Sequence, residues 1–180
     1  RLGGLHVLPI ITLTASHDTN IFLEPENEID DNILSARGDL DFVLPMEDFF
    51  LKFGGWAEAV RYSDTDTQDR EDWNVHASFG AEFPGGLNFM VGDRYSQLWL
   101  DPSDQIGRGE EYLLNELFVE LGYSIQDRAR IVAEYFNNLY EYDVSTDRDR
   151  QENVVTGTFY WRFQPKTSAL AEVSYGDFAY

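Results

Sequence analysis

Apolar and polar side chains alternate one by one over long stretches of the chain, and this pattern constrains the fold more than any other feature. Between Val75 and Phe83 every second residue is Val, Ala or Phe, and the residues between them are mostly polar. A period of two residues is typical of a β-strand with one apolar face, whereas an α-helix has a period near 3.6. The same alternation recurs over residues 49–58, 117–124, 129–136 and 154–163. The chain is therefore predicted to be all-β.

The pattern divides the chain into nine strand-like segments, near residues 5–19, 33–44, 49–62, 73–83, 87–100, 112–125, 129–142, 153–163 and 168–180. Short connections rich in Gly, Pro and Asp follow the second, fourth, sixth and eighth segments, and such residues favour tight hairpin turns. The other connections, near 20–32, 63–72, 101–111 and 143–152, are long and acidic. Strict alternation of short and long connections predicts an up-and-down antiparallel meander.

The meander has two interpretations, which differ in where the apolar face lies. A soluble antiparallel barrel or sandwich turns this face inward, whereas an outer-membrane barrel turns it toward lipid and keeps a polar interior. Many alanines lie among the large apolar residues, which suits lipid tails better than a close-packed core, and Tyr or Trp occurs near segment ends at Tyr62, Trp73, Trp99, Tyr112, Tyr123 and Trp161. We therefore expect a transmembrane β-barrel. Its predicted lipid face carries Phe79, Leu117, Val119, Leu121, Ile131, Phe159 and Trp161.

The odd number of segments predicts an incomplete barrel. Bacterial single-chain barrels have an even number of strands. Residues 1–180 are therefore expected to form a single outer-membrane β-barrel domain, incomplete at its C-terminal end, within a larger barrel of roughly 16–18 strands. The two ends of the chain should lie at opposite rims. The first and ninth strands should have unpaired outer edges, so further strands, from missing sequence or another chain, are needed for closure.

Composition excludes several classes of protein. Thirteen basic residues oppose 33 acidic ones, giving a formal net charge of −20, and such a chain is a poor partner for nucleic acid. The absence of cysteine excludes disulfides and Cys-ligated metal sites. No apolar run is long enough for a transmembrane helix. A hydrophobic content of 43% with 15% aromatic residues is too high for a disordered chain.

The polar face of the predicted barrel is expected to line its lumen. The candidate lumen-lining residues are Lys52, Glu58, Glu82, Glu116, Glu120, Arg130, Glu134 and Arg162. Acidic groups outnumber basic ones, so the lumen should favour cations or neutral, hydroxyl-rich solutes. Phe118, Phe136 and Tyr160 share this face and are candidates for stacking on sugar rings; the alternative is that they pack beneath a loop or plug.

The long acidic connections contain the candidate metal ligands. Asp64, Asp66 and Asp69 offer carboxylates of the kind that Ca²⁺ or Mg²⁺ prefers, so a weak cation site is one hypothesis. The segment lacks the Gly and the bidentate Glu of an EF-hand loop, and a solvated acidic loop is the alternative. No other cofactor is expected.

Catalysis is not expected either. Outer-membrane hydrolases place Ser/His or Asp/His pairs at the loop ends of strands, and Ser16, His17 and Asp18 lie at such an end. Neighbouring strand residues, however, point to opposite faces, and a triad is defined by geometry rather than adjacency. The protein is therefore predicted not to be an enzyme.

The first segment carries a resemblance to a known family. Gly3-Gly4-Leu5, Pro9 and the run Asp18-Thr19-Asn20-Ile21-Phe22-Leu23 resemble the opening of a β-barrel porin family found in the outer membrane of Gram-negative bacteria, often encoded beside exopolysaccharide genes. The resemblance implies a wide barrel in the cell outer membrane, in contact with lipid and lipopolysaccharide, that acts as a pore or secretion channel for exopolysaccharide. The contrasting hypothesis is a structural or surface-interaction barrel whose acidic extracellular loops bind cations.

Overall fold

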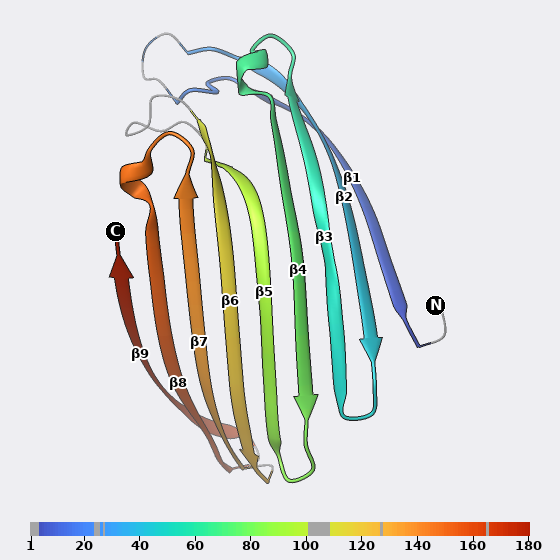
Figure 1. Cartoon of the computed structure of the whole chain (residues 1–180), viewed down its shortest axis with the longest axis vertical. Coiled ribbons are helices and arrows are strands. Elements are labelled where there is room, and N and C mark those ends of the chain that lie inside the picture. Colours follow the sequence, from blue (N-terminus) through green and yellow to red (C-terminus); the bar gives the residue numbers. More distant parts are fainter. Residues whose placement is uncertain (1–3, 24–25, 27, 101–108, 127, 165) are drawn as a thin grey trace.

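The computed structural model describes residues 4–23, 26, 28–100, 109–126, 128–164 and 166–180. Nine antiparallel strands form one sheet in chain order, so every strand pairs with its neighbours in sequence (Figure 1). The strands are β1 (His6–Asp18), β2 (Asp31–Pro45), β3 (Phe49–Tyr62), β4 (Arg70–Glu82), β5 (Leu87–Leu100), β6 (Glu110–Ile125), β7 (Ala129–Tyr142), β8 (Arg150–Gln164) and β9 (Thr167–Ala179). Two 3₁₀ turns, η1 (Asp66–Gln68) and η2 (Thr146–Arg148), lie in the connections after β3 and β7. Among the described residues, no helix is long and apolar enough to cross a membrane.

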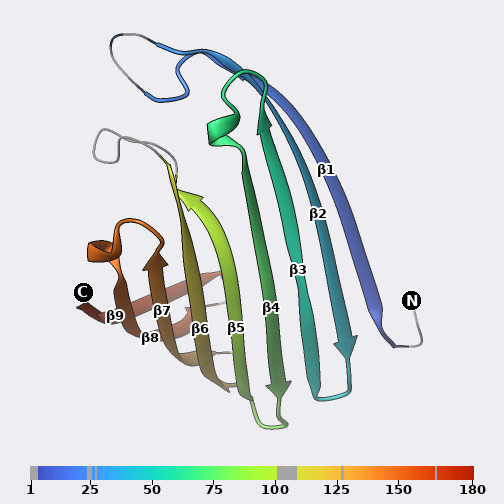
Figure 2. The same cartoon turned by 45° about the horizontal axis from the view of Figure 1, so that its top comes forward.

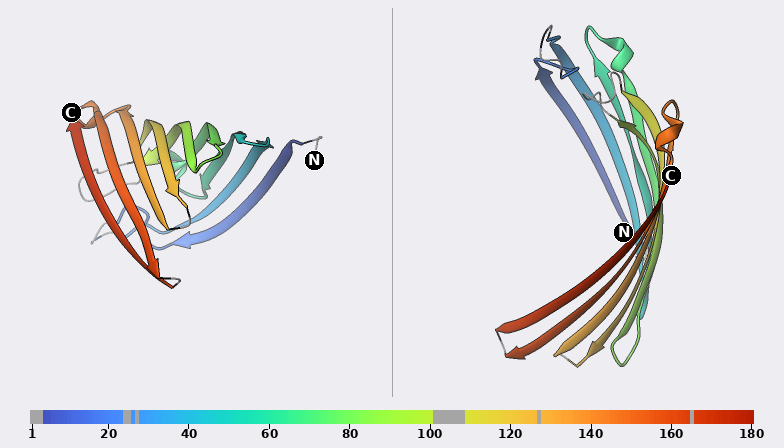
Figure 3. Two further views of the ribbon diagram at one scale, coloured as in Figure 1. Left: turned by 90° about the horizontal axis from the view of Figure 1, so that it is seen from below. Right: turned by 90° about the vertical axis from the view of Figure 1, so that its left-hand side faces the viewer.

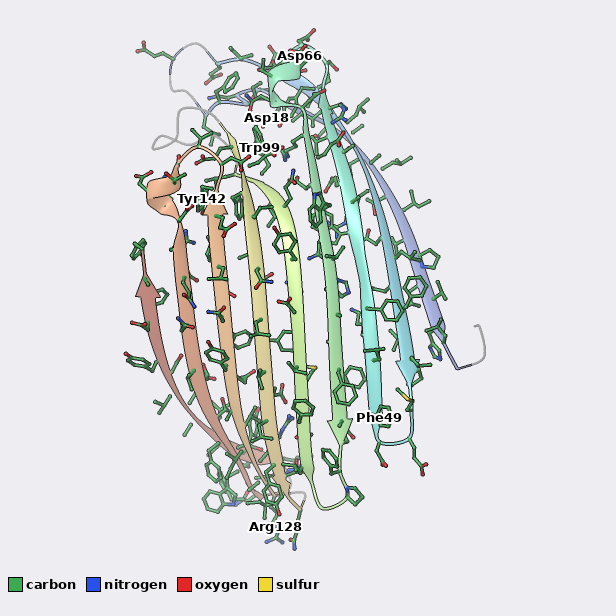
Figure 4. All side chains as sticks on the ribbon, viewed as in Figure 1. Asp18, Phe49, Asp66, Trp99, Arg128 and Tyr142 are labelled. Carbon is green, nitrogen blue, oxygen red and sulfur yellow. The ribbon has the colours of Figure 1, made fainter. Side chains whose placement is uncertain are left out.

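The predicted strand number, order and antiparallel direction are confirmed. Four connections cluster at one end of the sheet, here called the short-turn end, and the others lie at the opposite, long-loop end (Figure 1). Figure 4 shows Phe49 and Arg128 at the short-turn end and Asp18, Asp66, Trp99 and Tyr142 toward the long-loop end. β1 begins at the short-turn end and β9 finishes toward the long-loop end, as the sequence predicted.

The sheet is strongly curved and twisted but open (Figures 2 and 3). β1 and β9 are its two edge strands, and neither pairs with the other or with any further described strand. Pairing is continuous across the sheet, with a single register shift between Arg162 and Gln164 where β8 meets β9. Every side chain can therefore be assigned to one of two faces, because directly opposite residues share a face.

Tight turns follow their local chemistry. Between β4 and β5, Gly85 and Gly86 have φ values of +100° and +94°, which L side chains rarely adopt. A Cβ on Gly86 would also overlap the carbonyl oxygen of Ser124 on the neighbouring β6. This glycine therefore permits both the turn and the close approach of the next strand.

Four strands begin earlier than the apolar pattern indicated. β2, β4, β6 and β8 start at Asp31, Arg70, Glu110 and Arg150, two or three residues inside segments predicted as loops. These starts are polar, so alternation of apolar residues gave no signal there. The 3₁₀ turns η1 and η2 were likewise absent from the prediction, since each comprises only 3 residues.

The sheet has almost no conventional apolar core. Only four hydrophobic residues of the described chain are buried, namely Val60, Ala81, Leu114 and Tyr142. Polar residues are buried as well, with Asp31 at 1% and Asn74 and Ser96 at 3% exposure. The fold is thus organised by strand pairing and polar contacts, with its large apolar side chains left outside.

Candidate functional site on the polar face

The eight predicted lumen residues share one face of the sheet. The pairing register joins the positions of this polar face from strand to strand, as in the row Lys52, Ser78, Gly92, Phe118, Phe136 and Val154. By the same register, the polar face carries Lys52, Glu58, Glu82, Glu116, Glu120, Arg130, Glu134 and Arg162. That these residues line a lumen remains a prediction.

The polar face is also the less exposed face. Along β2 from Asp31 to Val43, the polar-face residues are buried or intermediate, whereas the residues between them are mostly exposed. Much of β8 alternates in the same sense. Because no described element covers either face, this difference indicates that side chains crowd together more on the polar face than on the opposite face.

The opposite, apolar face carries all seven residues predicted to contact lipid. Phe79, Leu121, Phe159 and Trp161 are 36%, 51%, 43% and 50% exposed, and Leu117, Val119 and Ile131 share their face. Two of the six aromatic residues cited for interfacial positions do not fit, because the register places Tyr62 and Tyr112 on the polar face. Proximity to a strand end did not reveal the face.

A band of amide and carboxylate side chains crosses the apolar face over five strands. Its members are Asp93, Asn115, Asn137, Asn153 and Asp177. Asn115 donates a hydrogen bond of 2.9 Å to Asp93, and Asn137 donates one of 2.9 Å to Asn153. Toward the short-turn end, β6 continues on this face with Leu117, Val119, Leu121, Tyr123 and Ile125. The band therefore marks one boundary of the apolar surface.

The central part of the polar face contains a hollow of about 380 Å³ lined by residues of β2 to β6. Asp41 is one of the lining residues, and its carboxylate lies 3.4 Å from Lys52 Nζ and 2.9 Å from His76 Nε2. The Nδ1 of His76 lies 3.0 Å from the Oδ1 of Asn74, whose amide donates to Ser96 in a buried hydrogen bond of 2.9 Å. The floor of the hollow is thus a connected polar network.

Ion pairs surround this network. Arg37 binds Asp39 through Nε and Nη2 at 3.1 and 2.8 Å, and its guanidinium lies 3.9 Å from the ring centroid of Trp56. Arg94 pairs with Glu116 at 3.1 Å. Among the described residues, six acidic groups on this face form no ion pair, namely Asp18, Asp31, Glu58, Glu82, Glu134 and Glu172. The excess negative charge of the face therefore resides in unpaired carboxylates.

The three aromatic residues proposed for sugar stacking do not form one cluster. Phe118 and Phe136 are directly opposite each other on β6 and β7. The ring of Phe118 also covers Gly92, where an added Cβ would overlap it, so this ring has a packing role on the sheet. Tyr160 lies apart from them, toward the short-turn end, and is 48% exposed.

At the long-loop end, Asp31 organises the connection that contains η1. Its carboxylate accepts backbone hydrogen bonds from Ser63, Asp64 and Thr65 at 2.8 to 3.2 Å, and from Asn32 at 2.7 Å. Burial raises the pKa of Asp31, but a hydrogen bond with the Thr65 side chain and the backbone hydrogen bonds from Asp64, Asn32 and Thr65 outweigh it and hold the pKa below its usual value. The loop after β3 is therefore held in place by a carboxylate from the neighbouring strand β2.

A Tyr, Asp and Arg arrangement also holds this loop, and the same arrangement occurs in the β7–β8 connection. Asp69 accepts the backbone N–H of Tyr62 at 2.8 Å, and Arg70 reaches the Tyr62 hydroxyl at 3.3 Å. In the β7–β8 connection, Asp149 accepts from the N–H of Tyr142 at 2.7 Å and Arg150 donates to its hydroxyl at 3.1 Å.

In the β7–β8 connection Glu110 has the position that Asp31 has in the β3–β4 connection, and its carboxylate accepts a hydrogen bond of 2.9 Å from the N–H of Ser145. This repeat was not predicted from the sequence. The recurrence of Tyr-x₆-Asp-Arg at both connections was the available signal.

The three candidate metal ligands are not assembled into a metal site. Asp69 is engaged by the Tyr62 amide, and its carboxylate lies 3.6 Å from Arg61 Nε. Asp66 belongs to η1, and its carbonyl accepts from the Asp69 N–H. No group of three or more His, Asp or Glu side chains in the described part of the chain is placed to hold a metal. Cation binding by Asp64, Asp66 and Asp69 stays a prediction.

The side chains of Ser16, His17 and Asp18 likewise do not converge on one point. Ser16 and Asp18 share the polar face, whereas His17 lies on the other and is 3.9 Å from Asp30. Asp18 accepts the backbone N–H of Asn20 at 2.9 Å. These contacts cap the end of β1 and provide no nucleophile with an adjacent base.

No protein-family model, curated protein or solved structure matches this chain. The similarity to the β-barrel porin family therefore rests on the opening residues alone, of which Gly3 lies outside the described part of the chain.

Proposed function

We propose that this sheet is part of the wall of a transmembrane β-barrel in a bacterial outer membrane, and that its polar face lines an aqueous pore or secretion channel. The observation that carries the proposal is the complete separation of the two predicted sets of side chains. Most of the large exposed apolar residues lie on one face, and most of the paired and unpaired charges lie on the other, less exposed one. A soluble sheet would bury the first face rather than the second.

The extent of the apolar surface supports this proposal. On β6 it runs from Leu117 to Ile125, which is about 27 Å along a strand and about 21 Å along an axis to which the strand is tilted by about 40°. The apolar band of outer-membrane barrels is about 25 Å tall. The polar band of Asp93, Asn115 and Asn137 then corresponds to the lipid–water boundary at the long-loop end.

In a membrane, the open edges of β1 and β9 require further strands to pair with. Unpaired N–H and C=O groups in hydrocarbon cost several kcal/mol each, and β1 and β9 each have 13 residues with one unpaired edge. We propose that further strands, from the same or another chain, close a barrel of roughly 16–18 strands.

The chemistry of the polar face suggests the class of solute. Its unpaired groups are mainly carboxylates, so cations and neutral, hydroxyl-rich solutes are favoured over anions across the central part of the face. Exopolysaccharide is the solute that the resemblance implies, and the protein is proposed to transport it without chemical change. The acidic loops would face the exterior.

Fractionation of the complete protein, followed by conductance measurements in planar bilayers, tests the proposal. We expect it in the outer-membrane fraction, soluble only with detergent, and forming cation-selective channels. Exchanging Glu116 for Gln on the polar face should lower cation selectivity, whereas exchanging Glu111 for Gln on the apolar face of the same strand should not. Membrane insertion without any conductance would favour the structural, surface-interaction barrel, and a water-soluble protein would refute the membrane proposal.

A further inference from the structure

Basic residues without an acidic partner gather at one place in this acidic protein. Most of the Lys and Arg side chains that the structure describes form an ion pair within 4.0 Å. In the described part of the chain, Arg128, Arg162 and Lys166 form none. All three lie at the short-turn end, in or beside the β6–β7 and β8–β9 turns (Figure 4, where Arg128 is labelled).

Two of these residues line one hollow, together with Arg130. The hollow has a volume of about 530 Å³ and is formed by the ends of β6, β7, β8 and β9. The backbone brings the arginines together, since the N–H of Arg162 donates to the carbonyl of Arg128 at 2.6 Å. Arg130 is directly opposite both Ser124 and Tyr160. Three arginines, from the β6–β7 turn, β7 and β8, thus line the same space.

The rest of the lining suits an anion. Ser124, Gln126, Tyr160 and Ser168 supply neutral polar side chains, and no described carboxylate lines the hollow. Glu120 pairs with one nitrogen of Arg130 at 3.0 Å, and the guanidinium has further N–H donors besides that one. Arginine donors in a planar fork match the oxygens of a carboxylate or phosphate.

We propose that this hollow is a binding site for an oxyanion, such as a phosphate or carboxylate group. The proposal does not depend on the sheet being a channel wall, because it rests only on the three arginines and the carboxylate-free lining. A protein of formal net charge −20 repels anions in general, so anion binding requires such a local site. The oxyanion belongs either to a free solute or to the headgroup of a lipid.

Equilibrium dialysis of radiolabelled inorganic phosphate against the complete protein, in a zwitterionic detergent at low salt, tests the site. We expect saturable binding. Arg162→Gln should weaken it about tenfold, the effect of one charge-assisted hydrogen bond. Arg94→Gln is the matched control, since it removes the same charge from the same face but from a guanidinium already paired with Glu116. This variant should bind phosphate within about twofold of the native protein.

Competition identifies the source of the oxyanion. If an anionic phospholipid displaces the labelled phosphate at lower concentration than glucuronate does, the site recognises a lipid headgroup; the reverse order assigns it to a soluble anion. Both orders support the oxyanion site. The proposal is overturned if the native protein shows no saturable phosphate binding, or if the Arg162 and Arg94 variants, with unchanged circular dichroism, lose affinity equally.

Discussion

Leu121 provides the sharpest test of which solvent the apolar face meets. It is the middle of the five apolar-face residues of β6 between Leu117 and Ile125, and it is 51% exposed. If the face contacts lipid, Leu121→Arg places a charge about 10 Å from either boundary of the apolar band. Arginine at the midplane of a membrane barrel costs about 2–4 kcal/mol. On a surface exposed to water, the same change should alter the free energy of unfolding by less than about 0.5 kcal/mol.

Leu113→Arg is the matched control. Leu113 is on the same strand and face, but it lies beyond Asn115 and the polar band, next to Glu111. In lipid this position is at or outside the boundary, where arginine costs about 0–1 kcal/mol. The lipid interpretation therefore predicts a difference of at least about 1 kcal/mol between two identical substitutions on one strand.

Reversible denaturant unfolding of the complete protein in short-chain phosphatidylcholine vesicles, followed by tryptophan fluorescence, measures both costs. The protein has 4 Trp residues, so its intrinsic signal suffices. Equal midpoints for the native protein and both variants would contradict a lipid-facing surface. A large cost for Leu121→Arg that persists in a soluble, detergent-free sample would instead assign the apolar face to a protein contact.

Three further predictions concern the loops and turns. Asp31→Asn should speed amide hydrogen exchange at Ser63 and Thr65, because a side-chain NH₂ replaces an accepting oxygen; Glu28→Gln, on an exposed residue, should not. Folding lowers the pKa of Asp31, so the ionised carboxylate stabilises the folded protein fully above the unfolded pKa of about 3.9. This contribution is lost as the pH falls through the lower folded pKa. Protection of the Ser63 and Thr65 amides from hydrogen exchange, measured against pH, should therefore decrease below about pH 4. Gly86→Ala should lower the free energy of unfolding by about 1 kcal/mol more than Gly85→Ala in a denaturant titration, since only the former meets the neighbouring strand.

Much of the fold could be predicted because side-chain alternation has a strict geometric meaning. A period of two assigns alternate residues of a strand to opposite faces, so Leu117 and Glu116 were separated correctly without any knowledge of their neighbours. The same logic failed at strand ends. Arg70 and Arg150 belong to strands because they pair with Val60 and Tyr140 of the neighbouring strands. Their side chains form ion pairs of 3.5 and 2.7 Å with the carboxylate two residues further on, which gives no apolar signal.

The candidate sites were less predictable, because they depend on register. Arg128 and Arg162 are far apart in the sequence, and only the pairing of β7 with β8 brings them into one hollow. Asp31 fastens a loop more than 30 residues further along the chain for the same reason. The acidic segment around Asp66 looked like a ligand set in the sequence, but tertiary contacts engage Asp69 elsewhere.

The sequence by itself determined the strand count, the order of short and long connections, and which side chains share a face within each strand. These properties follow from local chemistry, namely the two-residue period and the turn residues. The open edges of β1 and β9 agree with the prediction from the odd strand number. The tertiary structure alone decided how the rows of neighbouring strands align and that the charged face is the less exposed one. Alignment and curvature arise from hydrogen bonds and packing between strands, which no single segment contains.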